Sequence, residues 1–200
     1  MSRGSPGLTA IAKTRERRLR FALMRTVIPD PPPPELEALL ERRRRWGGDR
    51  HDEVWNGVLH MNPSPAGAHL HIEQQLGELL GPLARSAGLV PGIGSFNLGA
   101  PSDYRIPDGG LFREPTVGVW FSCAALALEI VSPGDETWDK LPFYAGHGVE
   151  ELLIVDPQKR TVQWLALSDG AYREIDHSRL IELGPAELGE RLDWPQLERG

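Results

Sequence analysis

Apolar residues recur with helical spacing in two stretches of the chain. Leu36, Leu39 and Leu40 lie between a run of four prolines and a run of four arginines, which predicts a helix within residues 35–46. A second apolar stripe recurs every three or four residues between 68 and 87, before a suitable stop at Gly88. It consists of Ile72, Leu76, Leu79, Leu80 and Leu83. This second helix is long enough to cover a sheet, although Pro82 is expected to kink it.

Strands are predicted by short apolar or alternating runs bounded by turn residues. An Asn-Gly pair inside residues 53–61 indicates a hairpin. Further strands are expected at 89–98, 104–107, 124–132, 151–156, 161–166 and 171–175. Two of these runs, at 124–131 and 152–155, are almost wholly apolar, as expected of central strands covered on both faces. With a short helix between 137 and 146, the pattern predicts an α/β (α+β) fold with a mixed central sheet flanked by helices.

The two ends of the chain differ from this middle part. Residues 1–30 mix Gly, Pro, Ser and basic residues with little periodic apolar content, which predicts a disordered basic tail. Met24 is an alternative start of the protein. Residues 31–184 are then expected to form a single domain, and residues 185–200 a peripheral C-terminal helix and tail.

Composition restricts the class of protein. The 200 residues are 40% hydrophobic and 25% charged, which suits one ordinary core. Cys123 is the single cysteine, so an internal disulfide is impossible and a reducing cytoplasm fits. No apolar run approaches the ~20 residues that span a bilayer. We therefore expect a soluble, cytoplasmic protein with no membrane partner.

The net charge of −6 is unevenly distributed. Residues 1–50 hold twelve Lys and Arg against six Asp and Glu, whereas the other 150 residues hold ten against twenty-two. A basic arm can dock nucleic acid through phosphate contacts, but such blocks are more often solvated tails. The acidic body argues against a broad DNA-coating surface, although a bound cation reverses the charge locally.

Glu129 is the one charged residue between Phe121 and Ser132, in a run that otherwise demands burial. Burying a carboxylate without partners is costly, so such a residue usually has a cation, a hydrogen-bond network or a cleft beside it. The alternative is that Glu129 lies at an exposed end of its strand.

Asp108 and Lys140 are candidate site residues because each can lie close to Glu129. Asp108 lies in a Pro-Asp-Gly-Gly sequence, which alone is an ordinary turn signal. An Asp and a Glu on neighbouring strands can nevertheless converge on one Mg²⁺ ion, which prefers such oxygen ligands. Lys140 can point back at the same site and stabilise charge on a phosphate. The alternative for Lys140 is a surface lysine paired with Asp139 or Glu136.

With these residues in place, the chain resembles the PD-(D/E)XK nuclease superfamily, and within it the bacterial restriction-endonuclease-like domain family labelled Uma-two. The resemblance covers about residues 52–166. It rests on a succession of short matches: Glu53-Val-Trp-Asn-Gly57, His69 with Ile72 and Leu76, Pro107-Asp108, Leu128-Glu129-Ile-Val-Ser-Pro133, Asp139-Lys140, Tyr144, Gly148-Val149 and Ile154-Val-Asp-Pro157. Each match alone is weak, but together they are specific.

The resemblance implies a metal-dependent endonuclease that hydrolyses DNA phosphodiester bonds. It implies that Asp108 and Glu129 are catalytic residues that bind Mg²⁺, with Mn²⁺ as a substitute, and that Glu53 supports the metal site. In the superfamily a Lys stands two residues after the Glu, where this chain has Val131. Lys140 resembles a migrated replacement for that catalytic lysine.

His69 and Tyr144 are further candidates. His69 matches the family pattern as a substrate contact or water-orienting base, and a structural histidine is the alternative. Tyr144 follows Lys140 by four residues and so shares its helical face. It is either a supporting residue of the site or a core aromatic.

Two functions stay open at this point. The first is a Mg²⁺-dependent endodeoxyribonuclease, for which a homodimer is favoured because cutting both strands of a duplex needs two active sites. The second is a catalytically inactive nuclease-fold module that binds nucleic acid or a protein partner, which the acidic body and Val131 support. Serine and zinc hydrolases are poorly supported because the chain lacks Gly-x-Ser-x-Gly and His-Glu-x-x-His sequences.

Overall fold

The computed structural model describes residues 25–26, 33–115, 117–134 and 136–196. The tail expected over residues 1–30, with Met24, lies outside these residues apart from Arg25–Thr26, which forms strand β1. The remaining elements are α1 (Pro34–Arg45), β2 (Glu53–Trp55), β3 (Val58–His60), α2 (Gly67–Ser86), β4 (Val90–Ile93), β5 (Asn97–Ala100), β6 (Asp103–Arg105), β7 (Gly109–Phe112), β8 (Trp120–Phe121), β9 (Leu126–Ile130), the 3-10 helix η1 (Thr137–Lys140), α3 (Leu141–Gly146), β10 (Glu151–Asp156), β11 (Thr161–Ser168), β12 (Ala171–Glu174) and α4 (Pro185–Arg191).

In the described residues, the strands form two mixed sheets of six strands each. The central sheet has the order β12-β11-β10-β9-β7-β4, and the second sheet has the order β1-β3-β2-β6-β5-β8. Within the central sheet β9 and β10 are parallel, and a parallel pair needs a crossover connection, which η1 and α3 provide. The predicted mixed α/β fold with flanking helices is confirmed, but its strands divide between two sheets.

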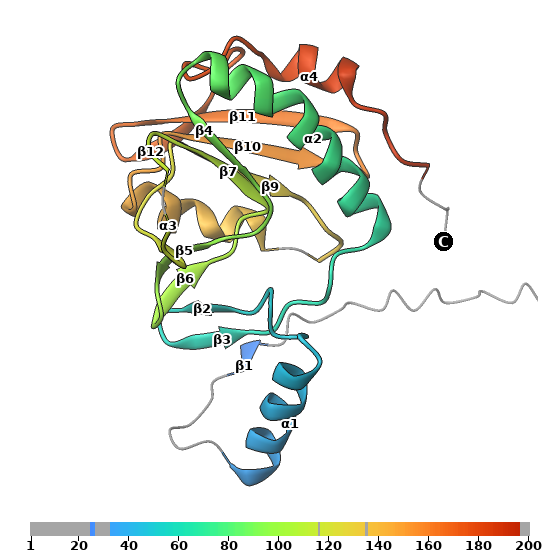
Figure 1. Ribbon diagram of the computed structural model, residues 1–200, viewed down its shortest axis with the longest axis vertical. Helices are drawn as coiled ribbons and strands as arrows, with labels where there is room; N and C mark the ends of the chain where they lie inside the picture. Colours follow the sequence, from blue (N-terminus) through green and yellow to red (C-terminus); the bar gives the residue numbers. More distant parts are fainter. Residues whose placement is uncertain (1–24, 27–32, 116, 135, 197–200) are drawn as a thin grey trace, which may run out of the picture.

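Helices cover both faces of the central sheet (Figure 1). On one face, Leu126, Leu128 and Ile130 of β9 pack in a core cluster with the apolar stripe of α2. On the other face, Ala127 packs in a second cluster with Tyr144 of α3. Because side chains alternate along a strand, the residue after Leu128 shares the α3 face with Ala127. Position 129 is therefore covered by the crossover helix.

Strand β7 occupies residues that the sequence predicts to be a turn. Gly109 and Gly110 pair with β9 on one side and β4 on the other. A Cβ on Gly110 would lie 2.9 Å from the carbonyl oxygen of Leu126 and 3.0 Å from the Phe96 ring. Glycine is needed here because two strands and a ring approach closely, not because the chain turns. The single strand expected at 89–98 is likewise wrong, since β4 and β5 belong to different sheets.

Helix α1 lies at the end of the molecule formed by β1, β2 and β3, away from the central sheet (Figure 1). None of its residues is buried. By contrast, α2 contributes six buried residues to the protein. Among the helices of the described ranges, none combines the length and the apolar character that crossing a lipid bilayer requires.

Candidate active site

Glu129 lies at the centre of a buried cluster of charged side chains. The side chain of Glu129 is 4% exposed and that of Lys140 is 8% exposed. The Lys140 Nζ lies 3.2 Å from both carboxylate oxygens of Glu129 and 3.0 Å from Oε1 of Glu53. The Tyr144 hydroxyl donates a hydrogen bond to Oε1 of Glu129. The alternatives of an exposed strand end for Glu129 and a surface position for Lys140 are therefore wrong.

The crossover after β9 brings Lys140 and Tyr144 to Glu129. Lys140 is the last residue of η1, and Pro142 lies in the first turn of α3, where a missing N–H removes no helical hydrogen bond. Tyr144 follows Lys140 by one helical turn and is fully buried. Both side chains therefore reach β9 from the same face of the central sheet.

Glu53 reaches the cluster from the hairpin of the second sheet. The Ile106 N–H donates to its Oε1 at 2.8 Å, and the Trp55 indole N–H donates to its Oε2 at 2.6 Å. Both oxygens are thus bonded, and Oε1 also faces Lys140. This arrangement anchors the ammonium group of Lys140. The role of Glu53 in supporting a metal site stays a prediction.

Asp108 lies beside Glu129 at the exposed edge of the cluster. Its backbone N–H donates to the Leu128 carbonyl at 2.9 Å, and its Oδ2 accepts from the Ile130 N–H at 2.7 Å. These bonds extend the β7–β9 pairing by one residue, which places Asp108 across from Glu129. With 18% of its side chain exposed, Asp108 is the carboxylate of this pair that solvent reaches more readily.

His69 holds the second oxygen of Asp108. Its Nε2 lies 3.1 Å from Oδ1 of Asp108, and its Nδ1 lies 3.4 Å from the Ser132 hydroxyl. His71 points elsewhere, with its Nε2 3.8 Å from the exposed Asp193. Of the two histidines in the first turns of α2, only His69 therefore joins the cluster.

Burial dominates the electrostatics of the cluster. It raises the pKa of Glu129 to about 8, with Asp108 and Glu53 adding to the rise and Lys140 opposing it most strongly. Burial also raises the pKa of the Tyr144 hydroxyl well above its usual value. Tyr144 is therefore a neutral hydrogen-bond donor to Glu129, whose charged form is destabilised by burial.

The carboxyl groups suit a divalent cation. Glu53 and Glu129 both contact the ammonium of Lys140, and the charge of Asp108 acts on Glu129. In the described ranges, no three or more His, Cys, Asp or Glu side chains are arranged to hold a metal ion. Mg²⁺ is usually held by one or two protein carboxylates and keeps several waters. Asp108 and Glu129 meet that smaller requirement.

Glu73 is a neighbour of the site that sequence reasoning missed. It follows His69 by four residues on α2 and is half-buried. Burial, and then the charge of Asp108, raises the pKa of Glu73, while His69 and His51 lower it. Its spacing from His69 is the signal that could have identified it, because residues four apart share a helical face.

Sequence reasoning also missed Trp55, which contacts Glu53, and Arg105, which contacts Trp55. Trp55 donates to Glu53 and stacks on His60, with ring centroids 4.3 Å apart. The Arg105 guanidinium lies between two rings, 4.2 Å from the centroid of Trp55 and 4.1 Å from that of Phe143. Nothing in the sequence marks Arg105, because this contact joins β2, β6 and α3.

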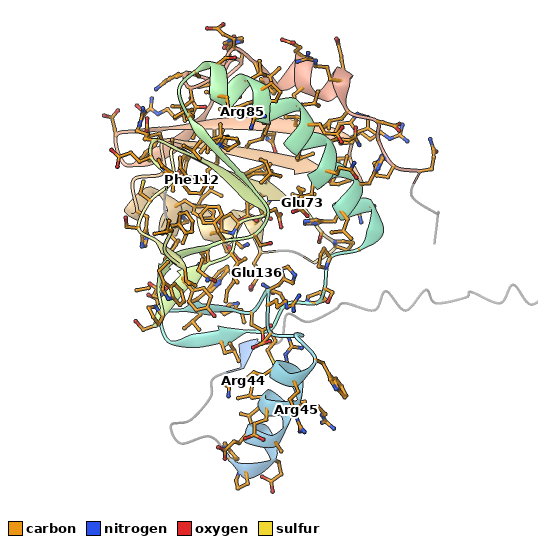
Figure 2. The ribbon with its side chains drawn as sticks, viewed as in Figure 1. Arg44, Arg45, Glu73, Arg85, Phe112 and Glu136 are labelled. Carbon is orange, nitrogen blue, oxygen red and sulfur yellow. The ribbon has the colours of Figure 1, made fainter. Side chains whose placement is uncertain are left out.

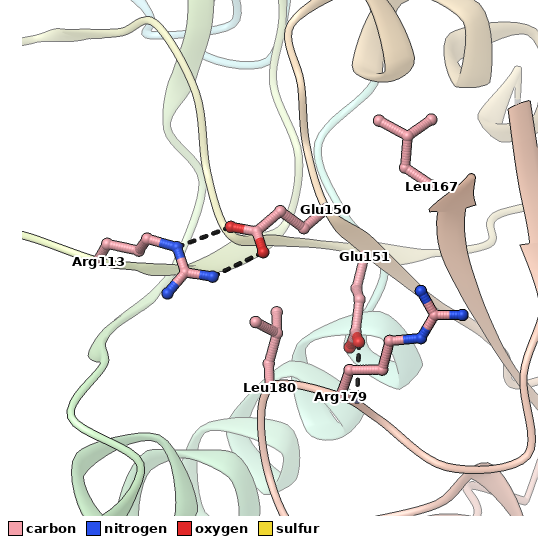
Figure 3. A pocket seen from close by; sticks show the side chains of 6 residues that line it. All are labelled: Arg113, Glu150, Glu151, Leu167, Arg179 and Leu180. Atoms are coloured by element: carbon pink, nitrogen blue, oxygen red, sulfur yellow. Dashed lines mark hydrogen bonds and ion pairs between the residues drawn. The ribbon is translucent and has the colours of Figure 1, made fainter. Parts of the chain in front are cut away.

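Figure 3 shows a hollow of about 270 Å³, and none of the residues of the charged cluster lines it. Arg113 and Glu150 form a bidentate pair there, in which the Arg113 Nε and Nη2 donate to the two carboxylate oxygens of Glu150 at 2.8 and 2.6 Å. Glu151 begins β10, three residues before Ile154, which pairs with Glu129, so the Glu151 side chain lies on the opposite face of the central sheet from Glu129. The hollow is lined by Arg113, Glu150, Glu151, Leu167, Arg179 and Leu180. The charged cluster, not this hollow, is therefore the candidate active site.

Glu129→Gln is expected to flatten the pH dependence of stability in metal-free buffer. The pKa of Glu129 is about 8 in the folded protein against an ordinary value of 4.5. Between these values the folded protein binds the extra proton, so the free energy of unfolding falls by up to about 1.4 kcal/mol per pH unit as the pH rises. The Gln variant lacks this loss.

Urea unfolding in EDTA, at several pH values from about 5 to 8, measures this difference. Glu78→Gln, at an exposed position of α2, is the matched control and should keep the wild-type slope. Equal slopes for wild type and Glu129→Gln would show that Glu129 is ionised in the folded protein throughout this range.

Comparisons with known proteins agree with this architecture. A family model, Uma2, described as "Putative restriction endonuclease", matches residues 34–193. A solved structure described as a "putative nuclease belonging to DUF820", from Anabaena variabilis, is 14% identical, with a TM-score of 0.57 over 70% of this chain and 90% of that chain. Among curated proteins no match was found. Because the family match spans more than half of the sequence, the chain belongs to the Uma2 family.

Proposed function

We propose that this protein is a divalent-metal-dependent endonuclease that hydrolyses phosphodiester bonds in DNA. The observation that carries the proposal is Glu129, buried and held by Lys140, with Asp108 beside it across the β7–β9 pairing. Phosphoryl transfer needs such a set, with carboxylates for a cation and a fixed positive charge near the developing negative charge. Cutting both strands of a duplex needs two sites, so the proposal includes a homodimer.

Each residue of the cluster has a defined part in the proposed reaction. Asp108 and Glu129 would hold Mg²⁺, or Mn²⁺ in its place. A bound divalent cation would polarise a phosphate oxygen and offset the charge that develops during attack by water. Lys140 orients Glu129 through both of its oxygens and adds positive charge beside the phosphate, while Glu53 fixes the ammonium from its other side. His69 orients Asp108.

A noncatalytic module is the second candidate function. It is favoured by Val131, which stands where the superfamily has a lysine two residues after the Glu. Lys140 reaches Glu129 from η1 instead, with its Nζ 3.2 Å from each oxygen. This geometry supports a migrated lysine and hence an active enzyme.

The test of the proposed function is cleavage of supercoiled plasmid and of single-stranded DNA with Mg²⁺, Mn²⁺ or EDTA. We expect nicked and linear plasmid with either metal and none with EDTA. Glu129→Gln, purified in the same way, controls for contaminating nucleases and should not cut. A folded wild-type protein that binds DNA but leaves the plasmid intact with both metals would establish the noncatalytic module instead.

A further inference from the structure

The C-terminal end of α1 carries a group of exposed side chains of two kinds. Arg42, Arg44 and Arg45 are exposed, and Trp46, which caps the helix, is 79% exposed. Figure 2 shows Arg44 and Arg45 on the helix at the end of the molecule opposite Arg85. A helix without buried residues gains little from core packing, so the exposed side chains are its main feature.

Arg43, in the middle of this group, fixes α1 to the hairpin that carries Glu53. Its Nη2 lies 2.6 Å from Oδ1 of Asp52, and its Nε lies 3.3 Å from Oδ2. The same Nη2 donates to the carbonyl of Gly48 at 2.5 Å. Asp52 directly precedes Glu53 in the chain, so the end of α1 has a fixed position relative to the candidate active site.

The loop between α1 and β2 also connects this surface to the open edge of the site. His51 belongs to this loop, and its charge acts on Glu73, which in turn lies close enough to Asp108 to feel its charge. Asp108 is the carboxylate of the cluster with an exposed edge.

The charges at this end of α1 have two explanations, and only one accounts for the tryptophan. Cations in the last helical turn match the helix dipole, which is equivalent to about half a charge. The dipole gives no reason for Trp46 to stand 79% exposed, because large apolar side chains usually gain free energy by burial. Guanidinium groups bind phosphates and aromatic rings stack on bases, so the two together suit a nucleic-acid strand.

We propose that the end of α1, formed by Arg42, Arg44, Arg45 and Trp46, docks a DNA strand, with the arginines on its phosphates and Trp46 stacked on a base. This proposal rests on the proposed function in naming DNA as the partner. The charge complementarity is local. Four consecutive arginines, residues 42–45, end the helix, whereas residues 51–200 carry an excess of twelve negative charges and repel DNA elsewhere.

Binding is tested without cleavage by fluorescence anisotropy in EDTA, with a labelled duplex and the matching single strand over a series of KCl concentrations. One variant combines Arg42→Ala, Arg44→Ala and Arg45→Ala, which preserves helix propensity. Its control combines Arg85→Ala, Arg173→Ala and Arg191→Ala, three exposed arginines elsewhere, and changes the net charge equally. We expect the α1 variant to weaken duplex binding about tenfold or more and to flatten the salt slope by about two to three units, at roughly 0.9 per lost phosphate contact. The control should stay within about threefold of wild type.

Trp46→Ala tests the stacking contact separately. We expect its affinity for the single strand to fall about tenfold, with a smaller effect on the duplex, whose bases are already stacked. Trp138→Ala, at another exposed tryptophan, is the control and should leave binding unchanged. Trp46→Phe should restore part of the lost affinity.

The docking surface is overturned if the α1 variant binds DNA as the control does, if wild type binds no DNA, or if the loss occurs only with RNA. Unchanged single-strand binding by Trp46→Ala overturns the stacking contact. Arginine-dependent binding by a wild type that does not cut supports the docking surface while the nuclease proposal fails. Normal cutting with unaltered binding in the α1 variant supports the nuclease and overturns the docking surface.

Discussion

Asp108→Asn is expected to lower the rate of metal-dependent DNA cleavage by about a thousandfold while the protein stays folded. The amide oxygen of Asn can still accept the hydrogen bond from the Ile130 N–H, so the β7–β9 pairing is kept. The variant lacks the negative charge that a divalent cation requires. A bound metal supplies several kcal/mol of transition-state stabilisation, and about 4 kcal/mol corresponds to a thousandfold change in rate.

Single-turnover cleavage of a labelled duplex measures the rate, and the shift of Tm with added Mn²⁺ measures metal binding. Asp139→Asn is the matched control, because Asp139 is an exposed aspartate next to Lys140. It should cut and bind Mn²⁺ as wild type does. If Asp108→Asn cuts at a rate within about fivefold of wild type, Asp108 is not a ligand of the catalytic metal.

The positions that the sequence predicts best are those whose environment is local in the chain. Glu129 stands out because its neighbours from Leu126 to Ile130 are apolar, and all of them are buried. The Asn56-Gly57 turn needs positive φ at both residues, and the structure has φ of 50° and 80° there. Strand β10 begins and ends where it is expected, because its apolar run is bounded by polar residues.

The rest of the site depends on contacts between distant segments. Spacing alone left Lys140 either on the surface or at the site, and only the crossover through η1 places its Nζ 3.0 Å from Glu53, a residue of the other sheet. Arg105 has no local signal, because its two aromatic neighbours come from β2 and α3. Gly109 and Gly110 have the composition of a turn, and their role in close strand packing is visible only once β7 lies between β4 and β9.

Above the pKa of about 8 of Glu129, where this group is ionised, Lys140→Met is expected to reduce the free energy of unfolding by about 3 to 5 kcal/mol, because it removes the cation from Glu53 and Glu129. Lys159→Met is the matched control. The Lys159 Nζ lies only 2.6 Å from Asp156, closer than the Lys140 Nζ lies to Glu53 or Glu129, but the Lys159 side chain is 73% exposed. An exposed ion pair contributes about 0 to 1 kcal/mol, so burial and not distance decides the size of the effect.

Urea unfolding of the two single variants measures this difference, and a double variant identifies its cause. Adding Glu129→Gln to Lys140→Met removes one of the two unpaired carboxylates, so we expect part of the lost stability to return. The same substitution should restore nothing in the Lys159→Met background. If Lys140→Met costs no more than Lys159→Met, the ammonium does not pair with Glu129 in the folded protein. The proposal that Lys140 orients the Glu129 carboxylate would then also be wrong.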